Sequence, residues 1–199
     1  MQSSDRSAVV GGLARAFYDD PLFNHFVPDP ISQSKALLAF MGAGLADAAP
    51  FGETWIARTD GKIACSAVWL PPGAYPRTVR RDLLSSLRGA PTFVRSGRRL
   101  AGAVRLLGAV DKAHHEVPEP HYYLNILGTD PLFQRMGAGS AALLPVLERC
   151  DREGLAAYLE TQKEENLAYY ARHAFELIKK VDVGGVPPIW TMLRKPRSG

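Results

Sequence analysis

The sequence predicts an α/β domain with a mixed sheet, and three observations support this prediction. Apolar residues recur at helical spacing near the N-terminus, an Asp-Gly pair then indicates a hairpin, and the last third alternates between strand-like and helix-like segments. Such alternation is typical of helices that cover a sheet. No internal repeat or long linker divides the 199 residues, so we expect one domain over 1–199.

The individual elements follow from the spacing of apolar residues and from the turn and capping residues between them. Asp60-Gly61 favours a tight hairpin between its flanking strands, and Gly154 ends a long helix. Ser32 is the expected N-cap of the second helix, after a loop at 20–30. Helices are predicted at 4–18, 32–48, 77–112 (two, broken near Pro91), 137–153 and 165–173. Strands are predicted at 54–58, 62–70, 121–129, 156–161, 177–183 and 189–193, with a loop at 113–120.

Charge is concentrated in one segment. The net charge of +4 divides into +7 over residues 75–112, from eight arginines and one lysine against two aspartates, and −3 elsewhere. We interpret this segment mainly as a solvated helix face, with attraction of phosphorylated or acidic partners as the alternative. Nucleic acid is not an expected partner, because no binding motif accompanies the charge.

Composition excludes several classes of protein. Cys65 and Cys150 are too few for a disulfide framework or a four-thiolate zinc site, and their apolar neighbours predict two small buried side chains. No apolar run approaches the ~20 residues of a membrane span, and no signal peptide is evident, so we expect a cytoplasmic protein without a membrane partner. The run His114-His115-Glu116 is not expected to bind metal, because adjacent loop residues seldom converge on one ion.

A glycine-rich loop lies between the strand at 121–129 and the helix at 137–153. Gly137 and Gly139 let the backbone approach a ligand at a helix start, where free amides and the helix dipole favour a pyrophosphate. The loop lacks the Gly-Lys-Ser/Thr ending of a P-loop. A dinucleotide fingerprint remains open, with Ala142 in third place and Glu160 as its acid, although that motif's strand runs almost directly into the first glycine.

The loop resembles the acetyl-CoA loop of the GNAT superfamily of N-acetyltransferases, Gln/Arg-x-x-Gly-x-Gly/Ala. Gln134, Gly137 and Gly139 match its three fixed positions. Arg135 and Met136 depart from the smaller or lysine residues common there, which leaves the backbone amides unchanged.

Further matches follow the loop. Asn166, Tyr170 and Phe175 fit the family's Asn-x-x-x-Tyr-x-x-x-Gly-Phe stretch, except that Ala174 replaces the glycine. If that position needs a positive φ, alanine carries about 1–2 kcal/mol of strain. The flanking segments resemble the branch that includes puromycin N-acetyltransferase. The resemblance is clear over 121–196, weaker over 1–75, and fades over 76–118, a variable basic helical insertion.

The resemblance implies the GNAT fold: a mixed, mostly antiparallel central sheet with a splayed parallel strand pair and helices on both faces. Acetyl-CoA, as cosubstrate, would lie between the strands at 121–129 and 156–161. Its pantetheine arm would bond to the backbone beside Gly128, and Asn166 would bond it or order its own helix. The residues expected to bind the cofactor are Leu127, Gly128, Thr129, Gln134, Arg135, Met136, Gly137, Ala138, Gly139, Ser140 and Asn166.

The implied reaction moves acetyl directly to a primary amine of a small molecule. Tyr170 is the expected general acid towards the departing sulfur. Because an alkylamine is mostly protonated at neutral pH, a base is needed, and Glu160 is preferred to His121 or water. We expect no resident metal, and a monomer or homodimer.

Two alternatives remain. One is a non-catalytic CoA-binding sensor or interaction module of the same fold, and the other is an acetyltransferase of protein N-termini or lysines. The acceptor would contact aromatic residues outside the recognisable motifs. The candidates are Phe23, His25, Phe26, Trp69, the 71–118 insertion, and Tyr122 or Tyr123.

Overall fold

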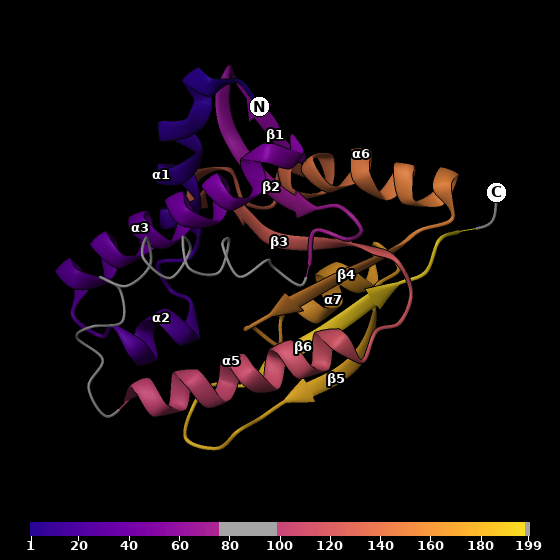
Figure 1. The fold of residues 1–199 in the computed structure, drawn as a ribbon. Helices are drawn as coiled ribbons and strands as arrows, with labels where there is room; N and C mark the ends of the chain where they lie inside the picture. The colour runs from indigo at the N-terminus through magenta and orange to yellow at the C-terminus, as the bar shows by residue number, and fades with distance from the viewer. Residues whose placement is uncertain (76–98, 198–199) are drawn as a thin grey trace.

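The computed structural model describes residues 1–75 and 99–197, and its centre is a six-stranded mixed sheet (Figure 1). The strand order is β1-β2-β3-β4-β6-β5, and β3–β4 is its parallel pair, whereas the other neighbours are antiparallel. The strands are β1 (Thr54–Thr59), β2 (Lys62–Leu70), β3 (His121–Thr129), β4 (Ala156–Thr161), β5 (Glu176–Val181) and β6 (Ile189–Arg194).

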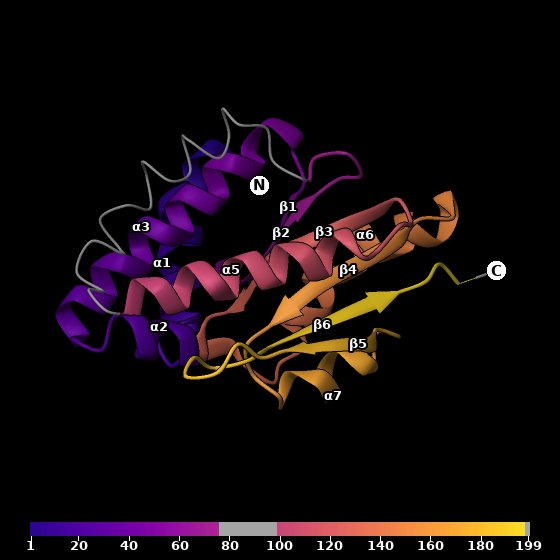
Figure 2. The ribbon, with the colours of Figure 1, turned by 60° about the horizontal axis from the view of Figure 1, so that its bottom comes forward.

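Helices cover both faces of this sheet, as predicted. In Figure 1, α5 passes in front of β6 and β5 while α7 lies behind them, and the turned view of Figure 2 separates the same two layers. The helices are α1 (Arg6–Ala16), α2 (Pro21–Phe26), α3 (Pro30–Ala48), α5 (Leu100–His115), α6 (Ala138–Glu153) and α7 (Asn166–Ala171), with 3-10 turns at Ser3–Asp5, Ala49–Phe51 and Pro131–Phe133.

Three apolar clusters hold these layers together. The first packs α6 and α7 onto one face of the sheet around Trp69, Leu143 and Phe175. The second packs α1 and α3 onto the other face around Leu13. The third joins α2 and α5 to the β5–β6 end around Leu106. Within the described residues, no helix is long and apolar enough to cross a membrane.

The hairpin and the C-terminal elements confirm the sequence predictions. Asp60 (φ 50°) and Gly61 (φ 75°) both adopt the left-handed conformation that a tight hairpin turn requires. β3 and β4 have the predicted bounds, and the other C-terminal elements differ by at most two residues at either end. Gly154 ends α6 with φ 66°, as a C-terminal glycine should.

Two N-terminal predictions were wrong for one reason. The segment 20–30 was expected to be a loop, but it contains α2, because Asp20 accepts hydrogen bonds from the first-turn amides and Pro21 occupies the first helical position. Ser32 was expected to cap α3, but the cap is Asp29, whose carboxylate accepts the amide N–H of Ser32. An Asp-Pro pair starts a helix in both places.

The basic segment is described only in part. Residues 76–98, which include the predicted helix before Pro91, lie outside the described residues. The second predicted helix corresponds to α5, which continues to His115 and so shortens the predicted loop at 113–120.

One extra residue in β3 shapes the centre of the sheet. Val68 and Trp69 are consecutive in β2, yet they pair with Ile126 and Leu124, so Asn125 is a β-bulge. Before the bulge, Leu124 packs towards α6; after it, Ile126 packs towards α1 and α3, and Leu127 packs towards α6. Because of the bulge, residues after Asn125 point to the opposite side of the sheet from the side that regular alternation along β3 would give them.

Candidate active site

The parallel strands separate at the bulge. β3 and β4 pair from His121↔Ala156 to Leu124↔Leu159, although β3 continues to Thr129 and β4 to Thr161. The pairing register contains no partner in β4 for the last five residues of β3. Because unpaired strand edges present backbone donors and acceptors, an extended ligand can bond there as an added strand would. We call this region, Asn125–Thr129 facing Glu160–Thr161, the fork.

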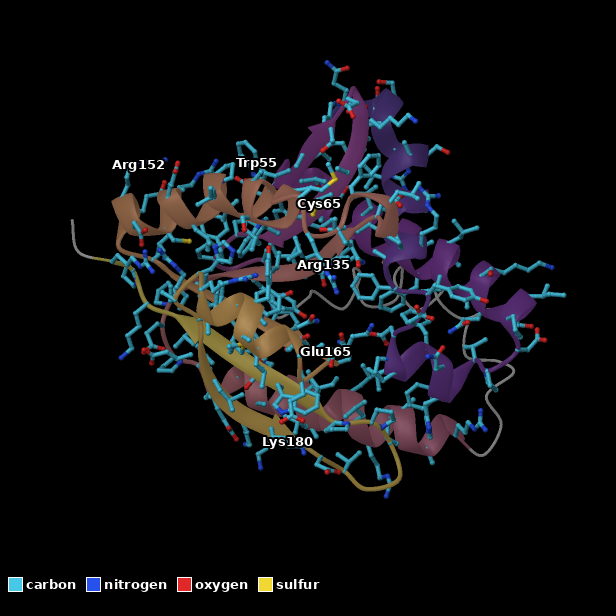
Figure 3. The ribbon with its side chains drawn as sticks, turned by 180° about the vertical axis from the view of Figure 1, so that it is seen from behind. Trp55, Cys65, Arg135, Arg152, Glu165 and Lys180 are labelled. Atoms are coloured by element: carbon cyan, nitrogen blue, oxygen red, sulfur yellow. The ribbon has the colours of Figure 1, made fainter. Side chains whose placement is uncertain are left out.

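The glycine-rich loop follows the fork directly. Gly137 (φ 82°) is the N-cap of α6, and no side chain caps the amides of its first turn. Arg135 also has a positive φ of 64°, which turns the chain back towards the helix. Figure 3 labels Arg135 on the face of the molecule that carries α6 and α7. The loop is solvent-exposed from Gln134 to Gly137, so its amides can reach an anion.

Side chains behind the loop fix its position. A Cβ on Gly139 would lie 2.5 Å from the Tyr169 hydroxyl oxygen, so any larger residue there requires Tyr169 or the helix start to shift. Ser140 Oγ and His173 Nε2 are 3.0 Å apart, and burial lowers the pKa of His173. Tyr169 and His173 therefore contact the first turn of α6 and fix its position.

The entrance to the loop is also fixed. Gln134 Nε2 is 3.5 Å from the carbonyl oxygen of Thr129, and Asp130 caps the short turn that follows. Asp130 also accepts from Arg15 Nε at 2.9 Å. The capped turn therefore separates the end of β3 from Gly137. In a dinucleotide-binding fingerprint the strand runs almost directly into the first glycine, so this connection does not fit that motif. The mostly antiparallel sheet opposes that alternative too.

Asn166 occupies the first position of α7, beside the end of β4. Its Nδ2 donates to Thr161 Oγ1 at 2.9 Å, which ties the helix start to the fork. The side chain is half-buried. The intramolecular bond fits the ordering role expected for this residue.

Tyr170 lies on the α6/α7 side of the sheet. Its side chain is buried in the first cluster, with its ring 5.9 Å from that of Phe175. Burial raises the pKa of the Tyr170 hydroxyl, so the phenol stays protonated at neutral pH. Among the described residues, no hydrogen-bond partner occupies this hydroxyl. Ala174, which follows α7, has φ 63°, so the conditional prediction of strain there is confirmed.

Glu160 lies on the opposite face, one residue beyond the last β3–β4 pair. Tyr123 Oη donates to its Oε2 at 2.7 Å, and His114 Nδ1 lies 3.6 Å from its Oε1. The carboxylate side chain is 12 % exposed. A group so placed can accept a proton at the mouth of the fork.

The histidine beside Glu160 was missed as a site residue. His114 is 3 % exposed and stacks on the Tyr75 ring at 3.9 Å. Its Nε2 is 2.9 Å from Nε2 of His121, the runner-up base. The sequence run 114–116 was considered only for metal binding, because its position on a helix facing β3 and β4 could not be read from spacing. Within the described ranges, no three ligand residues are grouped to hold a metal ion.

The aromatic candidates for the acceptor site divide into two sets. Trp69 is fully buried and Tyr122 is 5 % exposed, both in the first apolar cluster, so neither can line an open site. Phe26 is buried against α5. Tyr123 is half-buried beside Glu160 and fits the expectation.

A separate cavity of about 460 Å³ lies beside α1 and α3. It is lined by α1 and α3 and reaches Pro131, but none of its lining residues contributes to Glu160, Tyr170 or the glycine loop. We therefore assign no chemistry to it.

Known structures share the whole fold. A Corynebacterium glutamicum structure described as histone acetyltransferase HPA2 and related acetyltransferase has 21 % identity and a TM-score of 0.70, covering 100 % of this chain and 95 % of that one. A Drosophila melanogaster polyamine N-acetyltransferase has 16 % identity and a TM-score of 0.61, covering 98 % and 97 %. A mosquito arylalkylamine N-acetyltransferase like 5b has 13 % identity and a TM-score of 0.56, covering 98 % and 96 %.

These identities are low, so the similar structures establish the fold alone. Sequence similarity adds the family. The model of the Acetyltransferase (GNAT) family matches residues 15–175, which include the fork, the glycine loop and both sides of the candidate site. The chain therefore belongs to the Acetyltransferase (GNAT) family.

Proposed function

We propose that this protein transfers the acetyl group of acetyl-CoA directly to a primary amine of a small molecule. The observation that carries the proposal is the fork, which lies beside an exposed glycine loop and has a protonated phenol, Tyr170, on one side of the sheet and a carboxylate, Glu160, on the other. Family membership supports acetyl-CoA as the donor. We also propose that the protein is related to the puromycin N-acetyltransferase branch, which the segments flanking the motifs over 121–196 resemble.

The cofactor residues have distinct roles in the proposal. The amides from Arg135 to Ser140 hold the pyrophosphate at the start of α6, where the helix dipole favours negative charge. The backbone from Leu127 to Thr129, including Gly128, bonds the pantetheine arm in the fork. Gln134, Gly137 and Gly139 give the loop its shape, and Asn166 orders the start of α7 beside it. Met136 and Ala138 contribute their main-chain groups.

The thioester is attacked without a covalent enzyme intermediate, because it is already activated. Both cysteines are buried, and burial raises the pKa of Cys65 to about 11 and that of Cys150 to about 12, which disfavours the nucleophilic thiolate. Glu160 accepts a proton from the amine nitrogen. The nitrogen forms the C–N bond, and the C–S bonding electrons go to sulfur, which takes the proton of Tyr170.

A small amine fits the polar side of the fork. The half-buried rings of Tyr75 and Tyr123 lie edge to face beside Glu160, and such rings attract an alkylammonium. By their descriptions, two of the similar structures are a polyamine and an arylalkylamine N-acetyltransferase, which supports a small-molecule acceptor.

The decisive experiment is a thiol-release assay with acetyl-CoA against a panel of amines that includes polyamines, arylalkylamines and aminonucleosides. We expect at least one amine to accelerate CoA release well above the hydrolysis background, with acetylated amine found by mass spectrometry. Peptides with free N-termini or lysines form a parallel panel. Binding of acetyl-CoA without acceleration by any member would favour the non-catalytic module instead.

A further inference from the structure

Contacts with neighbouring elements show which way the two flanks of α5 face. Glu116, the residue after the helix, accepts a hydrogen bond from Lys179 Nζ of β5 at 2.8 Å. On the other flank, His114 stacks on the Tyr75 ring, and Asp111 accepts a hydrogen bond from the Tyr75 hydroxyl. One flank of α5 therefore faces β5, and the other faces Tyr75 and the candidate active site.

Apolar side chains continue the flank that faces Tyr75. Leu107, Asp111 and His114 are spaced at i, i+4 and i+7, which places them on one face of the helix, and Val104 precedes Leu107 by one turn. Val104 is 62 % exposed and Leu107 is 61 % exposed, so both are open to a ligand. We call Val104 and Leu107 the apolar strip. It begins about 10 Å along the helix axis from His114.

Two aromatic rings connect this flank to Glu160. The Tyr123 hydroxyl donates to Glu160 Oε2 at 2.7 Å, and the Tyr123 ring lies 5.6 Å from that of Tyr75, edge to face. The Tyr75 hydroxyl in turn reaches Asp111 on α5. These four residues form one row of contacting side chains, which the apolar strip extends away from the fork.

Charge is unevenly distributed along this row. Its two carboxylates, those of Glu160 and Asp111, lie at the active-site end, and the apolar strip carries no charge. Helical spacing places Arg105 and Lys112 on the flank of Glu116, which faces β5. An ammonium group is therefore favoured near the carboxylates, whereas a second charge over the strip would lose water without gaining a partner.

We propose that the acceptor carries a single amine at the end of an apolar body, and that this body lies along α5 over the apolar strip. The inference rests on the proposed function and narrows its substrate class to alkylamines and arylalkylamines. Binding is strengthened by burial of methylene or ring carbons against Leu107 and Val104. A polyamine is disfavoured, because its distal ammonium group would face the same two side chains.

Alkylamines of increasing length test for the apolar body. From butylamine through hexylamine to octylamine, we expect KM to fall about twofold per added methylene, with kcat nearly constant, since one-sided contact gives about half the free energy of full burial. Hexamethylenediamine has the chain of hexylamine and a second charge, so its KM should be about tenfold higher than that of hexylamine. Equal KM values for this pair, or a lower value for the diamine, would overturn the proposal.

Charged variants of the strip test where the body lies. Leu107→Glu changes an exposed side chain and offers the distal ammonium group a partner. We expect the ratio of kcat/KM for hexylamine to that for hexamethylenediamine to fall about tenfold, because one substrate loses an apolar contact and the other gains an ion pair. Val104→Glu, one turn further from the fork, should favour a longer diamine such as decamethylenediamine. Unchanged ratios in both variants would refute the assigned position of the body.

Leu177→Glu is the matched control. Leu177 is a 52 % exposed leucine on β5, so this variant adds the same charge outside the strip and should keep the wild-type ratio. An equal change in the control would trace the effect to net charge and overturn the inference. Acetylation of amines without preference for an apolar chain would refute this inference alone, whereas failure of every amine to accelerate CoA release would refute the proposed function itself.

Discussion

The two faces of the sheet differ sharply at the fork. On the α6/α7 face, Tyr170 sits among apolar side chains and keeps its proton. On the α5 face, Glu160 lies among a phenol donor and two linked imidazoles. Burial in an apolar cluster keeps the phenol in its proton-donating form, whereas the polar neighbours of Glu160 hold its carboxylate at a fixed place beside the fork. The two faces therefore offer the two kinds of group that an acyl transfer to an amine uses.

The largest expected effect is on the polar face. Glu160→Gln keeps the shape and the contact with Tyr123 but cannot take a proton. We expect kcat for acetyl transfer to fall about 10³-fold, within the range of general base effects. Steady-state kinetics with the best amine of the panel would measure it. Glu165→Gln, on the exposed residue before α7, is the control. A wild-type rate in Glu160→Gln would remove this carboxylate from the chemistry.

The next effect concerns the apolar face. Tyr170→Phe removes only the hydroxyl from a packed ring, and we expect kcat to fall about 10²-fold with acetyl-CoA affinity nearly unchanged. The loss should shrink with acyl donors whose thiol leaves more easily. Because burial keeps this phenol protonated, the pH profile should retain its shape. Tyr18→Phe, on a 41 % exposed ring, is the control, and an equal loss there would point to general destabilisation.

A smaller effect is expected at the loop that both faces share. Gly139→Ala places a methyl group 2.5 Å from the Tyr169 hydroxyl, so the first turn of α6 must shift. An overpacking cost at the lower end of its range, about 1.4 kcal/mol, corresponds to roughly tenfold weaker binding of acetyl-CoA. Isothermal titration calorimetry would measure it. Gly108→Ala, in open space on α5, should bind normally. Equal affinity in both variants would contradict the assigned role of the loop.

The smallest effect on activity is expected at an ion pair that stabilises the fold on the α6/α7 side of the sheet. Arg194 donates two hydrogen bonds to Asp151, at 2.8 and 2.7 Å, joining β6 to α6, and holds the pKa of that carboxyl below its ordinary range. Asp151→Asn should lower the free energy of unfolding by about 2 kcal/mol at pH 7 and leave kcat unchanged.

The pH dependence of this difference has a definite sign. A depressed pKa in the folded state contributes stability that is fully present above the unfolded value near ~4 and disappears as pH falls through the folded value. Urea denaturation of both proteins at pH 7 and pH 3 should therefore give a gap that narrows in acid. A constant gap would mean that the ion pair does not cause it.

The sequence predicted most of the fold, but only part of the site. The strand bounds, the hairpin and the glycine loop followed from local chemistry, because Asp60-Gly61 and Gly137 act within a few residues of themselves. Glu160 was placed near the fork by the family resemblance. His114 could not be found, since its importance comes from α5 lying over two strands that are distant in sequence. Asp20 and Asp29 show the opposite failure, a local signal that was present and misread.

The bulge at Asn125 has a consequence for how this site could be lost. The side chain of the extra residue carries none of the chemistry; the site depends on the number of residues between His121 and Thr129. Substitutions at Asn125 would leave that count intact. A one-residue deletion there would instead remove the bulge, and Leu127 would keep its side of the sheet, because Leu124, Ile126 and Leu127 would then alternate regularly between the two faces. The irregularity beside the fork is therefore encoded by chain length rather than by residue type.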